Sequence, residues 1–230
     1  MSLVGRALAA ISRPCYVARD GRRTLPGPCS CAKSAGLLLT VLRPPALRRG
    51  AKIHIAAPSG PVPRERFEAG LARLKACLPD AEIELADNLW HQQGYFAGDD
   101  KSRLRSLQAA LADPSIDAII AARGGYGLSR LLGNLDPAGL RQAPKILVGF
   151  SDNTALLCWA LARAKIASIH GPVISQLGGL DDEDLDRLLE LLRGEDPATL
   201  VADQGAVLHG GRVQGRLIGG NLEVLRSLLG

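Results

Sequence analysis

The stretch ILVGFSDNTALL, residues 146–157, predicts a buried strand that enters a helix through a sharp turn. Apolar residues fill its first half, and apolar residues resume beyond Thr154 at the start of a helical pattern. The turn itself holds Gly149, Ser151 and Asp152. A strand, a Gly-x-Ser turn and a helix form the setting of a nucleophile elbow, which lifts a serine hydroxyl above the sheet edge. The pattern departs from Gly-x-Ser-x-Gly, because Asn153 occupies the position of the last glycine.

Two interpretations of this turn stay open on the local pattern. Free N–H groups and the positive end of the helix dipole would lie beside Ser151 and stabilise the oxyanion of an acyl-transfer intermediate. Alternatively, Ser151 or Asp152 is only the N-cap of the helix that follows.

Strands and helices alternate on both sides of this stretch. The patterns predict strands at residues 52–57, 82–86, 116–122, 145–150 and 167–169, and helices at residues 64–78, 99–112, 127–132, 153–164 and 181–193. Such alternation indicates βαβ units, and therefore an α/β fold with a parallel sheet and flanking helices. Ligands in such folds bind at the carboxyl ends of the strands, where polar or glycine-rich loops follow four of these strands.

One of these loops is RGGYG, residues 123–127. Gly124 and Gly125 would let the backbone approach a ligand closely and hold an anion, although a plain tight turn is the alternative. Arg123 is a candidate to receive a substrate carboxylate, or it braces its own loop. Neither the dinucleotide-binding nor the P-loop spacing is present.

Composition narrows the choice of partner and compartment. The net charge is +5, yet residues 1–50 contain nine of the Lys and Arg residues and one acid, so the remainder is mildly acidic. A nucleic-acid partner is therefore not expected. The five cysteines show neither disulfide nor zinc spacing, which favours a reducing compartment, and no segment is apolar enough to span a membrane. We predict a basic, disordered extension at residues 1–50, a nucleophile-bearing domain at 51–176, and a linker with an incomplete second α/β domain at 177–230.

Several motifs occur in a characteristic order along residues 52–230. They are AAPSG at 56–60, RGGYG at 123–127, LLGNLD at 131–136, PK at 144–145, GFSDNTAL at 149–156, HGP at 170–172 and GGNL at 219–222. In this order they resemble the LD-carboxypeptidase (muramoyltetrapeptide carboxypeptidase) family, serine peptidase family S66. The family is also similar to hydrolases that confer immunity to peptide-nucleotide antibiotics.

The resemblance implies a flavodoxin-like or amidotransferase-like N-terminal domain and a set of roles. Ser151 would be the nucleophile, and the N–H of Asp152 with one from the turn at Gly124 and Gly125 would form the oxyanion hole. Arg123 stands beside them as a substrate-binding candidate. The substrate would be a murein tetrapeptide that loses its terminal D-alanine during cell-wall recycling in the cytoplasm. No cofactor or metal is implied, and homodimers are common in the family.

The sequence departs from the family in its last part. The family takes the Glu and His of its triad from a C-terminal domain, and no residue after Gln176 matches either motif. We therefore expect a truncated chain with impaired activity, or a catalytically silent peptide-binding module as the alternative. His170 could substitute as a base, although a hydrogen-bonding role is the simpler interpretation.

Overall fold

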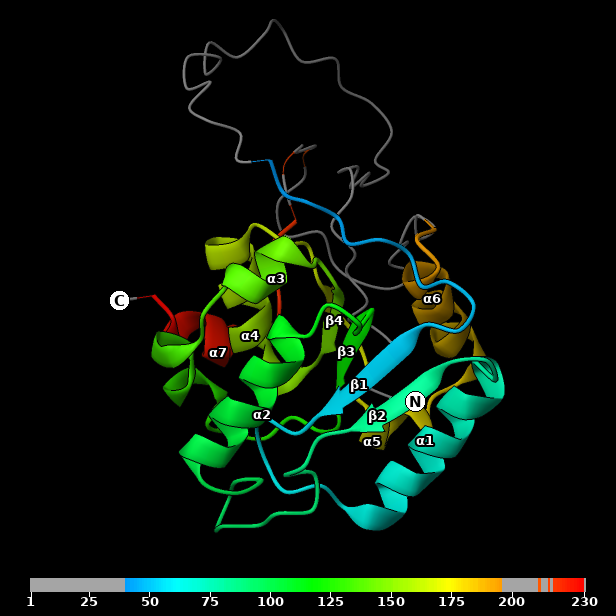
Figure 1. Ribbon diagram of the computed structural model, residues 1–230, viewed down its shortest axis with the longest axis horizontal. Helices are drawn as coiled ribbons and strands as arrows, with labels where there is room; N and C mark the ends of the chain where they lie inside the picture. The colour runs from blue at the N-terminus through cyan, green and yellow to red at the C-terminus, as the bar shows by residue number, and fades with distance from the viewer. Residues whose placement is uncertain (1–39, 196–210, 212–214, 216, 230) are drawn as a thin grey trace, which may run out of the picture.

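Five parallel strands form one sheet in the part of the chain that the computed structural model describes, residues 40–195, 211, 215 and 217–229 (Figure 1). Their order is β2-β1-β3-β4-β5. The strands are β1 (Lys52–Ala56), β2 (Glu82–Leu85), β3 (Ala118–Ala121), β4 (Ile146–Gly149) and β5 (Ile169–His170). The parallel sheet confirms the predicted α/β class.

Helices cover both faces of this sheet. They are α1 (Arg64–Cys77), α2 (Asp100–Ala112), α3 (Ala138–Gln142), α4 (Thr154–Trp159), α5 (Ile174–Leu177), α6 (Asp182–Leu192) and α7 (Leu222–Ser227), with the 3-10 helices η1 (Leu128–Arg130), η2 (Leu132–Asn134) and η3 (Ser151–Asn153) and the π-helical turn η4 (Ala160–Ala164). In Figure 1, α1, α5 and α6 lie on one side of the sheet, and α2, α3 and α4 lie on the other.

Alternation along the strands supplies a hydrophobic core to each face. Ile120 and Val148 pack into the core with α1, α5 and α6, whereas Ile119 and Leu147 pack into the core with α2, α3 and α4. All four residues are buried, because a parallel sheet that carries helices on both faces has no solvated side. The central strands are therefore held rigidly from both sides.

The strand register brings the candidate site residues to one edge. Ile55 of β1 pairs with Ile120 of β3, and Ile120 pairs with Val148 of β4. Three residues beyond each of these come Pro58, Arg123 and Ser151. Loops far apart in the sequence therefore meet at the carboxyl ends of β1, β3 and β4.

Local structure differs from the predictions where short turns replace regular helix. The segment 127–132 forms the 3-10 helices η1 and η2 instead of a short α-helix, after Gly127 takes a φ of +106°. The predicted helix 153–164 is divided into α4 and η4, and it ends at Lys165 with a φ of +61°. Helices α3 and α5 were not predicted, because helices of five and four residues are too short to show a helical period of apolar residues.

The ordered domain begins earlier than predicted. Leu42 forms a parallel bridge with Ile166, its N–H donating to the carbonyl of Lys165 over 2.8 Å. Leu47 N–H donates to the Leu192 carbonyl over 2.8 Å, and the Arg43 guanidinium donates to the Gly194 carbonyl. Residues 40–50 thus belong to the folded body, which corrects the proposed start at residue 51. The rest of the predicted extension, residues 1–39, lies outside the described residues.

The proposed boundary at residue 176 also moves. Helix α6 buries Leu185, Leu188 and Leu192 in the same core as β1 and β4, which places it with the sheet domain. Within the predicted linker and second domain, residues 196–210, 212–214, 216 and 230 fall outside the described residues. The GGNL motif leads into α7, where Asn221 N–H donates to Thr154 Oγ1 over 2.9 Å. In the described part of the chain, no helix combines the length and apolarity needed to cross a bilayer.

Candidate active site

Ser151 occupies a strained turn between β4 and α4. Its φ is +60°, whereas Phe150 before it is extended with a φ of −138°. A left-handed backbone at a residue other than glycine costs on the order of 1–2 kcal/mol. Such strain persists where the surroundings enforce it, and it is concentrated at functional sites. This geometry is the one expected of a nucleophile elbow. The N-cap residue of α4 is Asn153, which makes no side-chain cap hydrogen bond.

Asn153 holds this turn in shape. Its side-chain amide donates to the Phe150 carbonyl over 3.0 Å and to the Arg123 carbonyl over 3.2 Å, which joins the ends of β3 and β4. A Cβ on Gly149 would lie only 2.5 Å from the Cβ of Asn153. Gly149 therefore makes room for Asn153, and this explains why asparagine stands where the elbow pattern has its last glycine.

The Gly124–Gly125 turn lies against Ser151. A Cβ on Gly124 would be 2.9 Å from Ser151 Cβ and 3.3 Å from Ser151 Oγ, so only glycine allows the backbone to come this close. Gly125 has a φ of +133°, and a Cβ there would lie 2.8 Å from the Gly60 nitrogen. Gly60 N–H donates to the Gly124 carbonyl over 3.2 Å. The turn is thus packed between the serine and the loop after β1.

Asp152 contributes its side chain to the scaffold. The residue is buried, and its Oδ2 accepts a hydrogen bond from the Leu128 N–H over 3.0 Å. This bond ties the end of the glycine-rich loop to the elbow. The first N–H groups of a helix have no intrahelical acceptor, which leaves the backbone N–H of Asp152 as a donor beside Ser151.

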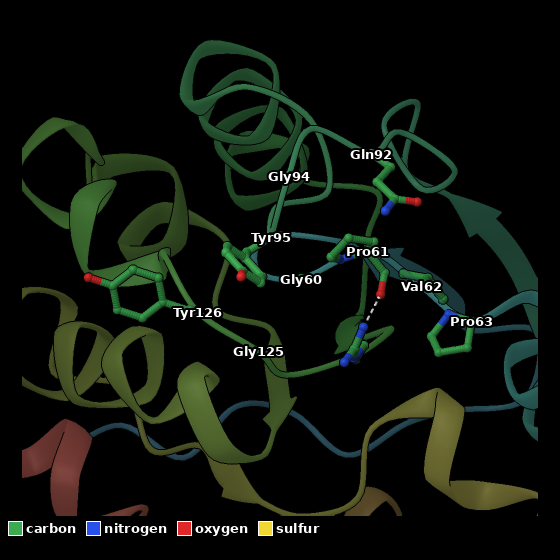
Figure 2. A pocket seen from close by; sticks show the side chains of 10 residues that line it. Gly60, Pro61, Val62, Pro63, Gln92, Gly94, Tyr95, Gly125 and Tyr126 are labelled. Carbon is green, nitrogen blue, oxygen red and sulfur yellow. Dashed lines mark hydrogen bonds between the residues drawn. The ribbon is translucent and has the colours of Figure 1, made fainter.

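An open pocket of about 710 Å³ adjoins the glycine turn (Figure 2). Tyr95 and Tyr126 lie at one end of it and the Pro61–Pro63 segment lies at the other. The lining residues are Gly60, Pro61, Val62, Pro63, Gln92, Gly94, Tyr95, Arg123, Gly125 and Tyr126. Ser151 is not among them, and Gly125 belongs to both the pocket and the turn beside the serine.

Arg123 is the one charged residue in this lining. Its Nη1 donates to the Pro61 carbonyl, so it braces the loop after β1, whereas the sequence interpretation had it brace its own loop. The guanidinium is a fork with five N–H donors, and one such bond leaves donors for a ligand. Bracing and ligand binding are therefore compatible.

Sequence reasoning missed the polar side chains that support these loops. Asn88 donates to the carbonyls of Ala57 and Ala97 over 2.8 and 2.9 Å. Arg103 is a charged residue, yet its side chain is completely buried. The signal was present, because Arg103 lies four and eight residues before the buried Leu107 and Leu111.

The histidines divide between the site edge and the sheet. His170 pairs with Gly149 in the register of β4 and β5, and its ring centroid lies 5.2 Å from that of Phe150. Its role as a base stays a prediction. His54 is buried in β1 with Nδ1 2.8 Å from Glu84. Among the described residues, no three His, Cys, Asp or Glu side chains are grouped to hold a metal ion.

The fold and the elbow are matched by known proteins. The family profile described as the LD-carboxypeptidase N-terminal domain covers residues 53–171, more than half of the chain. The chain belongs to the LD-carboxypeptidase family. The match includes the glycine turn, the elbow and the buried Arg103. The family resemblance inferred from the motifs is thereby confirmed.

Individual relatives extend this comparison beyond the matched domain. A Streptomyces coelicolor protein named as a carboxypeptidase is 38% identical over 198 residues, 83% of this chain and 62% of that protein. The murein tetrapeptide carboxypeptidase of Pseudomonas aeruginosa is 35% identical over 190 residues, 78% of this chain and 60% of that protein. The apo structure of the microcin C7 self immunity protein MccF gives a TM-score of 0.70 at 23% identity, covering 82% of this chain and 66% of that one, and shows the shared fold. The chain thus spans about three fifths of the length of these two carboxypeptidases.

Proposed function

We propose that this chain carries the nucleophile of a serine-type LD-carboxypeptidase that releases the terminal D-alanine of murein tetrapeptides. The observation that carries the proposal is the φ of +60° at Ser151, in a turn packed against Gly124. Family membership and the name of the Pseudomonas aeruginosa relative support the reaction and the substrate.

In the proposed reaction Ser151 Oγ attacks the carbonyl carbon of the scissile amide. The serine proton passes by way of a base to the leaving amine, which departs as D-alanine, and water then hydrolyses the acyl-serine. Negative charge forms on the carbonyl oxygen in between. The N–H of Asp152 and one from the Gly124–Gly125 turn are the proposed donors to that oxyanion, since both border Ser151. The sheet register brings His170 to the same edge of the sheet as Ser151. His170 is therefore the histidine to test as the base.

The pocket supports recognition of a peptide with a free carboxylate. A carboxypeptidase must bind the terminal carboxylate of its substrate, and Arg123 supplies a guanidinium without a competing acid in the lining. Tyr95 and Tyr126 add exposed aromatic surface beside it. We propose that the cleaved end of the peptide lies between Arg123 and Ser151.

The setting of this activity is part of the proposal. A role in cell-wall recycling, a cytoplasmic location and a homodimeric state are the properties that the family resemblance implies. The cysteine pattern supports a reducing compartment.

The first test is D-alanine release from a murein tetrapeptide by the 230-residue chain and its Ser151→Ala variant. We expect slow release by the unaltered chain, because the Glu and His of the family triad are not matched in it, and no release above background in the variant, which has no nucleophile. Release that does not depend on Ser151 would contradict the assignment. If neither protein releases D-alanine but both bind the tetrapeptide in calorimetry, the chain is a silent binding module.

A further inference from the structure

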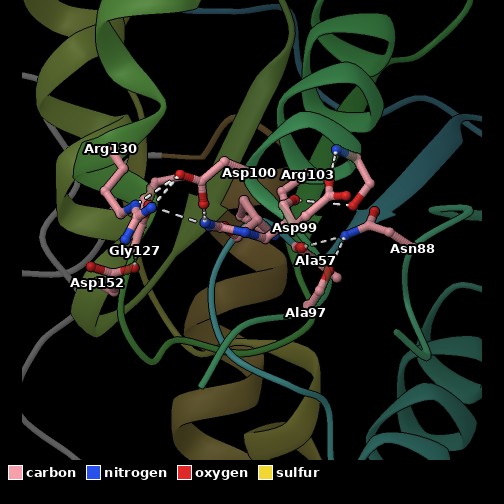
Figure 3. Close-up of polar contacts among 12 residues, drawn as sticks. Ala57, Asn88, Ala97, Asp99, Asp100, Arg103, Gly127, Arg130 and Asp152 are labelled. Carbon is pink, nitrogen blue, oxygen red and sulfur yellow. Dashed lines mark hydrogen bonds and ion pairs between the residues drawn. The ribbon is translucent and has the colours of Figure 1, made fainter. Parts of the chain in front are cut away.

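Arg103 is a completely buried cation at the foot of the candidate active site (Figure 3). Its Nη1 donates to the carbonyls of Pro58, in the loop after β1, and of Gly127, at the end of the glycine-rich loop. Its Nη2 donates to the carboxylate of Asp100, one turn earlier on α2. A buried charge is tolerated only when it is paired and hydrogen-bonded, so these acceptors define where the guanidinium must lie.

The bond to Gly127 fixes one particular peptide group. The Gly127 carbonyl accepts from Arg103 over 3.3 Å, and the N–H of the same peptide, on Leu128, donates to Asp152 Oδ2 over 3.0 Å. Because a peptide group is planar and rigid, a contact at each end sets its orientation. Asp152 follows Ser151 directly. A continuous path of hydrogen bonds therefore runs from Asp100 through Arg103 and this peptide to the elbow.

Phe96 and Arg130 complete the surroundings of this path. The Phe96 ring fills the space where a Cβ of Gly127 would lie, at 2.6 Å. The guanidinium carbon of Arg103 lies 4.8 Å from the centre of that ring, and that of Arg130 lies 5.3 Å from it. Arg130 also donates to the second Asp100 oxygen over 2.8 Å. Its side chain is half exposed, however, and it makes no hydrogen bond to the carbonyls of Pro58 and Gly127 that Arg103 contacts.

We propose that Arg103, oriented by Asp100, is a positioning residue for the elbow. It sets the Gly127–Leu128 peptide, and through it Asp152, so that Ser151 and the backbone donors beside it keep a productive arrangement. The proposal rests on the proposed function in taking Ser151 as the nucleophile. A lysine could keep the charge at this site, but its single ammonium group cannot reproduce the planar fork that reaches Pro58, Gly127 and Asp100 together.

The test compares Arg103→Lys with the matched control Arg130→Lys in the 230-residue chain. Arg130 shares Asp100 and the Phe96 ring with Arg103, so the pair isolates the contact to the loop carbonyls. The first readout is the backbone amide NMR signals of Leu128 and Asp152. The second is the rate at which an alkyl fluorophosphonate labels Ser151, with Ser151→Ala as the blank. Thermal melting shows the folded fraction of each variant.

We expect Arg103→Lys to shift both amide signals and to slow labelling on the order of 10²-fold, the effect of misplacing a reacting group by about 1 Å. Arg130→Lys should leave both readouts close to those of the natural chain. If Arg103 is only a structural residue, Arg103→Lys will lower the melting temperature while the signals and labelling per folded molecule stay as in the control. That result would overturn the proposal.

Two further outcomes separate this proposal from the proposed function. If the natural chain is not labelled above the Ser151→Ala blank, the nucleophile assignment has failed, and the amide signals alone decide whether Arg103 positions the elbow. If Arg103→Lys does not fold, Asp100→Asn takes its place, because it keeps the guanidinium and removes its orienting carboxylate. We then expect Asp100→Asn to shift the backbone amide signals of Leu128 and Asp152, by less than Arg103→Lys would. The absence of these shifts would overturn the proposal.

Discussion

At the elbow, two glycines allow neighbouring backbone to come close. Gly149 admits the Cβ of Asn153, and Gly124 admits Ser151, so the elbow and the Gly124–Gly125 turn pack at distances that a side chain on either glycine would block. Of these residues, only Ser151 combines a side chain with a left-handed backbone conformation. Its hydroxyl is thus presented at an energetic cost that the packed surroundings of the turn offset.

This strain predicts that Ser151→Gly is more stable than Ser151→Ala. Both variants lose the hydroxyl, but only glycine relieves the positive φ, and its greater freedom in the unfolded chain offsets part of the gain. We expect a difference of about 0.5–1 kcal/mol in the free energy of unfolding, measured by urea denaturation. Equal stabilities would show that the turn is relaxed in solution.

Between elements, the tightest contact described is that of α1 with α5. A Cβ on Gly70 of α1 would lie 1.8 Å from the carbonyl oxygen of Ile174, the first residue of α5. The short helix α5 leads out of the HGP motif after β5, so the glycine allows the chain beyond the sheet edge to rest directly on α1. Here the clash would be with backbone, which cannot rotate away as a side chain does.

We therefore predict that Gly70→Ala destabilises the protein by about 3 kcal/mol, because the added methyl forces α5 away from α1. Gly179→Ala is the matched control, since a Cβ there meets nothing within 4 Å and the residue is exposed. Chemical denaturation of both variants measures the difference. A loss no larger in Gly70→Ala than in Gly179→Ala would mean that the two helices are not in contact.

Across the whole molecule, carboxyl groups with lowered pKa values link the elements electrostatically. Hydrogen bonds from Lys52 and then His54 lower the pKa of Glu84, which joins β1 to β2. Burial raises the pKa of Asp100, but Arg130 and Arg103 outweigh it and hold that pKa below its ordinary value. The pKa is also lowered at Asp99 and Asp113 by hydrogen bonds from Ser102 and Ser115.

These shifts predict that the fold loses stability in acid. A carboxyl group whose folded pKa is depressed stabilises the protein above its ordinary value, here 3.8 for Asp and 4.5 for Glu, and this contribution disappears as the pH falls through the folded pKa. Burial raises the pKa of Asp184, so this one group changes stability with pH in the opposite direction. It is outnumbered by the four carboxyl groups whose pKa values are lowered. Urea denaturation between pH 7 and pH 3 should show a falling free energy of unfolding below about pH 4. Glu84→Gln should flatten that fall, and a fold equally stable at pH 3 and pH 7 would contradict the prediction.

The sequence by itself determined the fold class, the strand order along the chain and the position of Ser151 between a strand and a helix. Those features depend on periodicity and on residues next to one another, such as Gly149, Ser151 and Asn153, which a linear pattern displays. The family, too, could be inferred from the order of short motifs. Boundaries were less accurate, because short helices and 3-10 turns lack a period.

Only the tertiary structure decided which distant residues support the site. Arg103 meets Pro58 across 45 positions, and Arg43 meets Gly194 across 151, so neither contact leaves a local pattern. The same holds for Asp152, whose carboxylate binds the Leu128 N–H while the sequence offered it only as a helix cap or an oxyanion donor. Partners of this kind are set by the register of the sheet and the packing of its helices, which bring the loops together only once the chain has folded.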